Sequence, residues 1–259
     1  MKTAFFDSGL GGLSVLHCAM KRLRHEQFIF YADEDNVPYG NKSVELVREL
    51  TDRAFAFLVR QEVKAIVVAC NTATNAAVAV MREKYDLPII GMEPAAKLAL
   101  DTDGTRRVLV VATEGTVHGD KMKRLIAAYD KERLVDCHAL QRLVDFAELS
   151  EFVSPVVDEY LRRELADYDF SAYSALVLGC THFNYFKDSF RRLLPPNVRI
   201  LDGNEGTVRE LERRLAGIDA LEDLSPSVEY YYSGRRVTDE RELTRLADYM
   251  ARLDEMYEL

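Results

Sequence analysis

The sequence predicts an α/β protein with two similar doubly wound α/β domains, whose mainly parallel sheets face each other across a central cleft. Two continuous apolar runs, residues 65–69 and 175–179, carry this prediction, because such runs are typical of strands buried on both faces. Each run is followed by a Cys, Cys70 or Cys180, and then by helix-compatible sequence. Ligands bind at the carboxyl ends of strands in open α/β sheets. The two thiols therefore indicate one pocket approached from two sides.

The first hundred residues repeat the order strand, polar loop, helix, which predicts a parallel sheet. A strand at 3–6 runs into the glycine-rich loop 7–12, where the backbone can approach an anion closely and the next helix offers free N–H groups. A dinucleotide fingerprint would need Gly at Ser14, so the loop indicates an anion site more than a nucleotide site. The other expected elements are a helix at 13–24, a strand at 27–31, a helix at 43–60 capped by Ser43, the Cys70 strand, a helix at 72–84 and a strand at 87–91.

The stretch 107–202 repeats this organisation. A strand at 107–112 mirrors 3–6, and residues 142–148 are expected to be an irregular stretch. The remaining expectations are a helix to about 129, a weaker strand at 134–140, a helix at 151–165, the Cys180 strand, a helix at 183–194 and a strand at 198–202. The C-terminal segment is expected to hold a helix at 210–215, an edge strand at 228–233 and an amphipathic helix at 239–256.

Polar loops at 101–104 and 202–206 are candidate crossings between the two halves. We therefore expect a first domain of residues 1–98 plus 207–259, which carries Asp7 and Cys70. The second domain, residues 99–206, carries Cys180. In this arrangement the C-terminal segment returns to the first domain.

The composition is that of an ordinary globular protein, with a formal net charge of −9. This sign argues against nucleic acid or an anionic membrane as the main partner, since both attract basic surfaces. No apolar run is long enough to span a membrane, and the start MKTAFFDSG lacks the apolar core of a signal peptide. We therefore expect a cytoplasmic protein with a small-molecule substrate. The four Cys residues form no CxxC pair and are expected to be free thiols.

Three chemistries use two Cys residues in one pocket. Four-ligand zinc spacing is missing, and thiols on opposite walls of a cleft are poorly placed for disulfide exchange. Proton transfer at a carbon stereocentre fits better, because one base removes the α-proton from one face while a second group protonates the other face. Both Cys residues precede an expected helix amino end, which favours a thiolate. Asp7 and His182 are candidate proton partners, and Ser8, Asn71, Thr72 and Thr181 are candidate donors to a carbanion.

Several motifs in the same order resemble the glutamate racemases of the aspartate/glutamate racemase superfamily. They are FDSGLGG (6–12), Pro38-Tyr39-Gly40, ACNTA (69–73), Gly91-Met92-Glu93-Pro94-Ala95, GCTHF (179–183) and Asp202-Gly203. The resemblance implies a cofactor-independent, two-base racemase that interconverts L- and D-glutamate. It also implies a supply of D-glutamate for peptidoglycan, and so for cell-wall biogenesis and cell shape. A paired assembly, a homodimer, is common in the family.

The resemblance assigns roles by motif position. Cys70 and Cys180 would be the two acid/base thiols, with Asp7 and His182 as assisting groups. The substrate would contact Asp7, Ser8, Pro38, Tyr39, Gly40, Asn71, Thr72, Thr113, Thr116, Thr181 and His182.

Two segments depart from the family pattern. The family has a segment of pattern C-P-x-F-V-P-L-V-E whose Glu assists the second thiol, and residues 140–148 are the nearest match here without its prolines and Cys. Glu148 is therefore the assigned residue and Glu151 the fallback. Residues 113–116 follow the family's GT-x-x-T run only in part.

Two other functions stay open at this point. One is an aspartate racemase or another two-Cys racemase of the superfamily, from which Tyr39-Gly40 and Asn71-Thr72 are expected to distinguish a glutamate enzyme. The other is a non-catalytic amino-acid-binding regulator on the same scaffold, which the presence of both thiols disfavours. Residues 32–40 also have a plain alternative as a solvated acidic loop.

Overall fold

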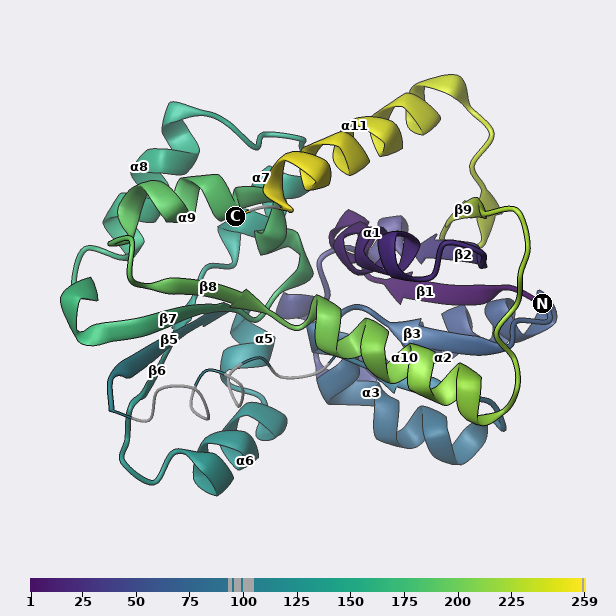
Figure 1. The fold of residues 1–259 in the computed structure, drawn as a ribbon, viewed down its shortest axis with the longest axis horizontal. Helices are drawn as coiled ribbons and strands as arrows, with labels where there is room; N and C mark the ends of the chain where they lie inside the picture. The colour runs from purple at the N-terminus through teal and green to yellow at the C-terminus, as the bar shows by residue number, and fades with distance from the viewer. Residues whose placement is uncertain (93–94, 96–98, 100–104, 258) are drawn as a thin grey trace.

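The computed structural model describes residues 1–92, 95, 99, 105–257 and 259. Its two sheets lie side by side, each flanked by helices on both faces (Figure 1). The expected α/β architecture with two mainly parallel, doubly wound sheets is confirmed. The loop 101–104 and the residues Glu93 and Pro94 lie outside the described residues.

The first sheet has six strands in the order β10-β9-β2-β1-β3-β4 and is parallel except for the β9–β10 pair. Chain segments far apart in sequence build it, because β9 adds to β2 from the C-terminal region. Its strands are β1 (Thr3–Asp7), β2 (Gln27–Ala32), β3 (Ala65–Val68), β4 (Ile89–Gly91), β9 (Ser227–Tyr232) and β10 (Arg235–Arg236).

The second sheet has four parallel strands in the order β6-β5-β7-β8. They are β5 (Arg107–Ala112), β6 (Val135–Ala139), β7 (Tyr173–Leu178) and β8 (Arg199–Asp202). The helices of the described residues are α1 (Leu13–Arg22), α2 (Val44–Arg60), α3 (Asn71–Lys84), α5 (Glu114–Val117), α6 (Asp120–Tyr129), α7 (Arg142–Glu148), α8 (Pro155–Glu164), α9 (Lys187–Leu193), α10 (Asn204–Gly217) and α11 (Glu240–Met256). Among these, none is both long and apolar enough to cross a membrane.

Alternating strand residues explain why both faces of each sheet are covered. In β1, Phe5 packs in a cluster with α1 and α10, whereas Phe6 packs on the other face with α2 and α3. In β5, Leu109 faces α8 and Val110 faces α6 in the same manner. The strands are therefore fixed in register by burial on two sides.

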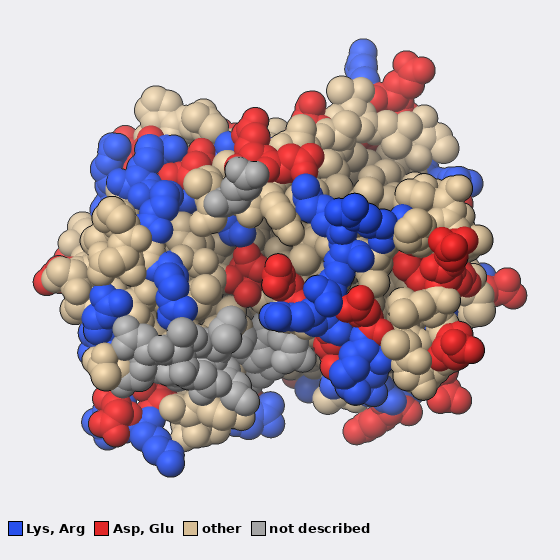
Figure 2. Space-filling view, in the orientation of Figure 1, with Lys and Arg blue, Asp and Glu red and all other residues tan. Residues whose placement is uncertain are grey.

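The C-terminal segment ties the two halves together. Helix α11 starts beside β9 and runs across the molecule to end near α7 (Figure 1). On the face shown in Figure 2, Lys and Arg side chains gather over α1 and α10 with acidic side chains among them. Arg22 of α1 pairs with Glu212 of α10, and Lys21 pairs with Asp254 of α11. These contacts hold α10 and α11 against the first sheet's own helix.

Several sequence expectations about elements are wrong. Residues 142–148 form α7 because the apolar side chains of this short segment, Leu143 among them, are buried in the main core cluster. The following helix begins at Pro155 rather than at Glu151, since Ser154 caps it and proline suits the first helical position. After Cys180 the chain forms a 3-10 helix, Thr181–Phe186, before α9 starts.

Two expectations about the C-terminal third also need correction. The expected crossing loop 202–206 is mostly helical, because the chain leaves β8 and enters α10 directly after Gly203. Strand β9 is not the outermost strand, since the two-residue β10 pairs along its free edge.

A buried ion pair fastens the C-terminal segment to the first sheet. Lys64 Nζ lies 2.6 Å from Glu26 Oε2, and both side chains are almost fully buried. Lys64 also donates to the carbonyl of Ala220 at 2.7 Å. Removing the cation would leave Glu26 charged and buried without its partner, which is strongly destabilising.

We therefore expect Lys64→Ala to lower the free energy of unfolding by about 3 kcal/mol. The matched control is Lys84→Ala, which removes a half-exposed pair with Asp52 and is expected to cost less than about 1 kcal/mol. Urea denaturation of both variants measures the difference. Equal losses in the two variants would contradict the structural role of Lys64.

Candidate active site

The candidate site lies where the carboxyl ends of four strands from the two sheets meet. Asp7 ends β1, Cys70 follows β3, Thr113 follows β5 and Cys180 follows β7 closely. Both thiols line the same cavity. The sequence predicted one pocket with a Cys on each of two sides, and the two side chains lie in this way. The predicted residues around this cavity are Asp7, Ser8, Pro38, Tyr39, Gly40, Cys70, Asn71, Thr72, Thr113, Cys180, Thr181 and His182.

The cavity is narrow in this structure. Its volume is about 10 Å³, which is room for about one water molecule. An amino acid is many times larger than this, so a substrate can enter only if the two walls separate. The structure therefore represents a narrow arrangement of the site.

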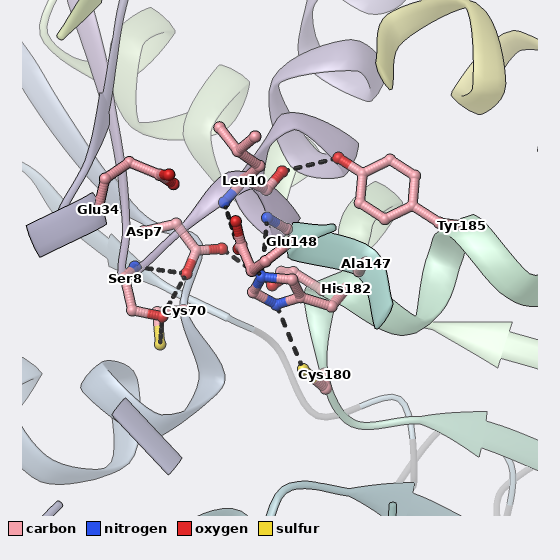
Figure 3. A network of polar contacts seen from close by, with 12 residues as sticks. Asp7, Ser8, Leu10, Glu34, Cys70, Ala147, Glu148, Cys180, His182 and Tyr185 are labelled. Carbon is pink, nitrogen blue, oxygen red and sulfur yellow. Dashed lines mark hydrogen bonds and ion pairs between the residues drawn. The ribbon is translucent and has the colours of Figure 1, made fainter. Parts of the chain in front are cut away.

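On the first wall, Cys70 is linked to Asp7 through a serine hydroxyl. The Cys70 thiol donates to Ser8 Oγ at 3.6 Å, and Ser8 Oγ donates to Asp7 Oδ1 at 3.1 Å (Figure 3). Cys70 is also the N-cap of α3, because its sulfur accepts the Ala73 N–H at 3.4 Å. Burial, reinforced by Asp7, nevertheless raises the pKa of the Cys70 thiol well above its ordinary value. The helix amino end alone does not make this thiol acidic.

On the second wall, Cys180 faces a histidine that is held by a glutamate. Cys180 Sγ lies 3.7 Å from His182 Nδ1, and His182 Nε2 lies 2.5 Å from Glu148 Oε1 (Figure 3). Burial alone would lower the pKa of His182, but its hydrogen bonds to Cys180 and Glu148 outweigh burial and raise the pKa well above its ordinary value. Burial would likewise raise the pKa of Glu148, but the hydrogen bond with His182 outweighs it and lowers that pKa. The directions of both shifts favour a charged imidazolium–carboxylate pair.

The glycine-rich loop joins the two walls. The Leu10 N–H donates to Glu148 Oε1 at 2.8 Å, and Tyr185 OH donates to the Leu10 carbonyl at 2.7 Å. Thr181 Oγ1 donates to Asp7 Oδ2 at 2.9 Å from the opposite wall. Burial raises the pKa of Asp7 despite this bond and the charge of His182. The Leu10 N–H of the loop thus binds an anion of this chain itself, the Glu148 carboxylate, whereas the sequence suggested a site for a ligand anion.

A threonine cluster bridges the walls at another side of the cavity. Thr72 Oγ1 lies 3.2 Å from Thr113 Oγ1 and 3.5 Å from Thr116 Oγ1, and Thr113 donates to Thr116 at 3.1 Å. Tyr39 OH donates to Asp33 Oδ2 at 2.6 Å, which fixes the ring beside the cavity. Of the predicted residues, Thr116 and Glu148 contact lining residues without lining the cavity themselves.

The two candidate glutamates occupy different places. Glu148 contacts His182, whereas Glu151 Oε1 accepts a hydrogen bond from Ser154 Oγ at 2.7 Å at the start of α8. Glu151 therefore stabilises the start of α8, and among the described residues it forms no hydrogen bond or ion pair with Asp7, Ser8 or His182.

Sequence reasoning missed three residues at the site. Val144 of α7 lines the cavity, and its helical spacing with the other buried residues of 142–148 was the available signal. Glu34 and Arg245 lie behind Glu148, and Arg245 Nη2 donates to the Glu148 carbonyl at 2.7 Å. The sequence carries no signal for this contact, because 97 residues separate its partners.

Gly11 is expected to be essential to the arrangement. A Cβ there would lie 2.4 Å from His182 Nδ1 and 2.6 Å from Thr181 Oγ1. Gly11→Ala would therefore push His182 away from Cys180, and we expect kcat/KM of any reaction at this site to fall about 100-fold. The control is Gly217→Ala, whose added Cβ meets nothing within 4 Å. Equal activity of the two variants would contradict the close fit around Gly11.

Comparisons with known proteins agree with this geometry. The family model described as Asp/Glu/Hydantoin racemase matches residues 14–211. A glutamate racemase from Campylobacter curvus is 51% identical over 265 residues, covering 100% of each chain. The solved glutamate racemase from Thermus thermophilus, in complex with β-chloro-D-alanine, has a TM-score of 0.76 and 34% identity over 95% of this chain and 91% of its own.

A solved glutamate racemase from Bacillus anthracis has a TM-score of 0.82 and 27% identity, covering 96% of this chain and 94% of its own. The likeness extends over nearly the whole length of this chain. The chain belongs to the Asp/Glu/hydantoin racemase family.

Proposed function

We propose that this protein is a glutamate racemase that interconverts L- and D-glutamate, with Cys70 and Cys180 as its two proton-transfer groups and without a cofactor. The observation that carries the proposal is the pair of thiols on opposite walls of one narrow cavity, each with its own proton partner. A racemase needs this arrangement, because the proton leaves one face of the α-carbon and arrives at the other. The reaction is also the one for which the full-length relatives are named.

Each turnover consists of two proton transfers. A thiolate on one wall takes the α-proton, so that an S–H bond forms and the Cα–H electron pair stays on the substrate as a carbanion. The thiol on the other wall then gives its proton to the opposite face of Cα and becomes a thiolate. The enzyme ends with its two protonation states exchanged, and the reverse reaction restores them.

The two walls differ in their proton partners. Cys180 Sγ has His182 Nδ1 as its neighbour at 3.7 Å, while burial raises the pKa of the Cys70 thiol, which donates a hydrogen bond to Ser8, and Ser8 donates in turn to Asp7. We infer that Cys180 is the base and Cys70 the acid for one enantiomer, and that the two roles are reversed for the other enantiomer. Hydrogen-bond donors around the cavity, namely Ser8, Asn71, Thr72 and Thr181, would stabilise the carboxylate side of the carbanion.

Substrate choice is tested by supplying both amino acids. We expect L-glutamate to lose its circular dichroism signal with the purified protein, and L-aspartate to keep it under the same conditions. Conversion of aspartate alone would leave the two-thiol chemistry standing and make the protein an aspartate racemase. Conversion of neither would favour a non-catalytic amino-acid-binding role.

The biological setting follows from the product. D-glutamate is a component of peptidoglycan, so the enzyme serves cell-wall biogenesis and cell shape.

We further propose a cytoplasmic location, which cell fractionation tests, and a homodimer, which sedimentation velocity tests. We also propose that residues 1–98 with 207–259 and residues 99–206 move as two bodies when the cleft opens.

A further inference from the structure

Helix α11 contacts α7, the helix that ends at Glu148. Arg245 Nη2 donates to the Glu148 carbonyl at 2.7 Å, and Tyr249 OH donates to the Ala147 carbonyl at 2.5 Å. These carbonyls belong to the last turn of α7, where backbone acceptors have no partner within the helix. The C-terminal helix, which follows the first sheet's β9 and β10 in the chain, thus caps the helix that follows β6 of the second sheet.

The Arg245 guanidinium also faces three carboxyl groups. Its nitrogens lie 3.8 Å from Glu148 Oε2, 3.7 Å from Glu34 Oε2 and 3.4 Å from Glu242 Oε2. Glu148 Oε2 and Glu34 Oε1 are buried and accept no hydrogen bond from any described residue. Figure 3 shows the Glu34 carboxyl group on the side of the loop that faces Glu148. Arg245 is therefore a second cation, besides His182, that offsets this buried negative charge.

We propose that Arg245, with Glu34 beside it, is a positioning residue for Cys180: it holds the Glu148 carboxylate against His182 and so holds the imidazole against the thiol. The proposal rests on the proposed racemase function and adds to it a connection between α11 and one of the two proton-transfer groups. The chain of contacts runs from Arg245 through Glu148 and His182 to Cys180. No comparable contact from α11 reaches Cys70 among the described residues, so the effect should fall on one wall only.

Glu34 adds a pH dependence to this arrangement. The groups that act on it are Glu148 of α7, His182 after β7, and Arg245 and Glu242 of α11, and Tyr232 of β9 lies near it. Burial, followed by the charge of Glu148, raises the pKa of Glu34 to about 8. Below this pH Glu34 is neutral, so it does not compete with Glu148 for the Arg245 guanidinium. Above it Glu34 becomes a second anion that competes for the same guanidinium.

The decisive variant is Arg245→Met, with Arg241→Met on the exposed side of the same helix as its matched control. We expect R245M to lower kcat about 10- to 100-fold, because a misplaced His182 weakens proton transfer at Cys180. R241M should keep the wild-type rate. Arg245→Lys, which keeps the charge, should recover the rate to within about tenfold of wild type.

Isotope effects distinguish a defect at Cys180 alone from a loss of activity that affects both proton transfers. Racemisation has an equilibrium constant of one, so kcat/KM must fall equally in both directions. With Cα-deuterated glutamate, R245M should raise the isotope effect on kcat/KM for the enantiomer that Cys180 deprotonates and lower it for the other enantiomer. A rate equal to that of R241M, or a lower rate with both isotope effects unchanged, would overturn the proposal. An inactive wild-type protein would instead refute the proposed function.

Glu34→Gln tests the second part. We expect kcat/KM of the wild type to decrease above about pH 8, where Glu34 ionises and competes for Arg245. The pH profile of E34Q should lack this decrease. The same decrease in both proteins would overturn the assignment to Glu34.

Discussion

Replacing either Cys70 or Cys180 with alanine is expected to lower the rate of glutamate racemisation about a thousandfold or more. Each variant keeps one thiol, which can serve one face of the α-carbon but cannot complete the transfer to the other face. Both side chains are buried and small, and each contacts its partner by weak sulfur hydrogen bonds at 3.6 and 3.7 Å. We therefore expect the fold to survive both substitutions.

Circular dichroism of the amino acid measures this loss, and far-ultraviolet circular dichroism of the protein checks the fold. The control is Cys137→Ala, because Cys137 lies on β6 and does not line the cavity. It should racemise glutamate at the wild-type rate. Full turnover by C70A or C180A would contradict the assignment of that thiol.

Substituting His182 with asparagine is expected to have the next largest effect, a decrease in kcat of about 100- to 1,000-fold. Asparagine keeps a polar side chain but carries no positive charge to stabilise a thiolate on Cys180. It also leaves the buried Glu148 carboxylate without its 2.5 Å partner. The measurement is the pH dependence of kcat/KM, in which H182N should lack the ionisation that belongs to His182.

The same substitution changes how stability depends on pH. The folded-state pKa of His182 lies well above the ordinary value of 6.5, so the charged pair stabilises the protein fully below about pH 6.5. This stabilisation is lost as the pH rises through the folded-state pKa. Wild type should therefore lose more unfolding free energy than H182N between neutral and alkaline pH. Parallel curves of unfolding free energy against pH for the two proteins would contradict the positive charge assigned to His182.

Residues at the carboxyl ends of strands were the predictable part of the site. Cys70, Cys180 and Asp7 all follow apolar runs, and a parallel sheet brings such positions to one edge whatever the intervening sequence. The motifs around them also identified the residues that line the cavity, apart from Val144. Local pattern was sufficient here because strand burial alone fixes these positions.

The helix α7 shows why the rest could not be predicted. It has seven residues and no side-chain cap, so little in its own sequence stabilises it. Burial of Leu143 and Phe146 in the core cluster forms the helix, while Arg245 and Tyr249 satisfy its last carbonyls. These contacts come from distant parts of the chain. The second wall of the site therefore depends on tertiary packing that no local pattern records.

Deuterium incorporation during the first few per cent of conversion tests the two-base claim most directly. L-glutamate is incubated with the protein in D2O and followed by proton NMR with chiral analysis. We predict that the D-glutamate formed carries deuterium at Cα while the remaining L-glutamate keeps its proton, since different thiols serve the two faces. Deuterium appearing equally in both enantiomers from the start would show a single base and contradict the account.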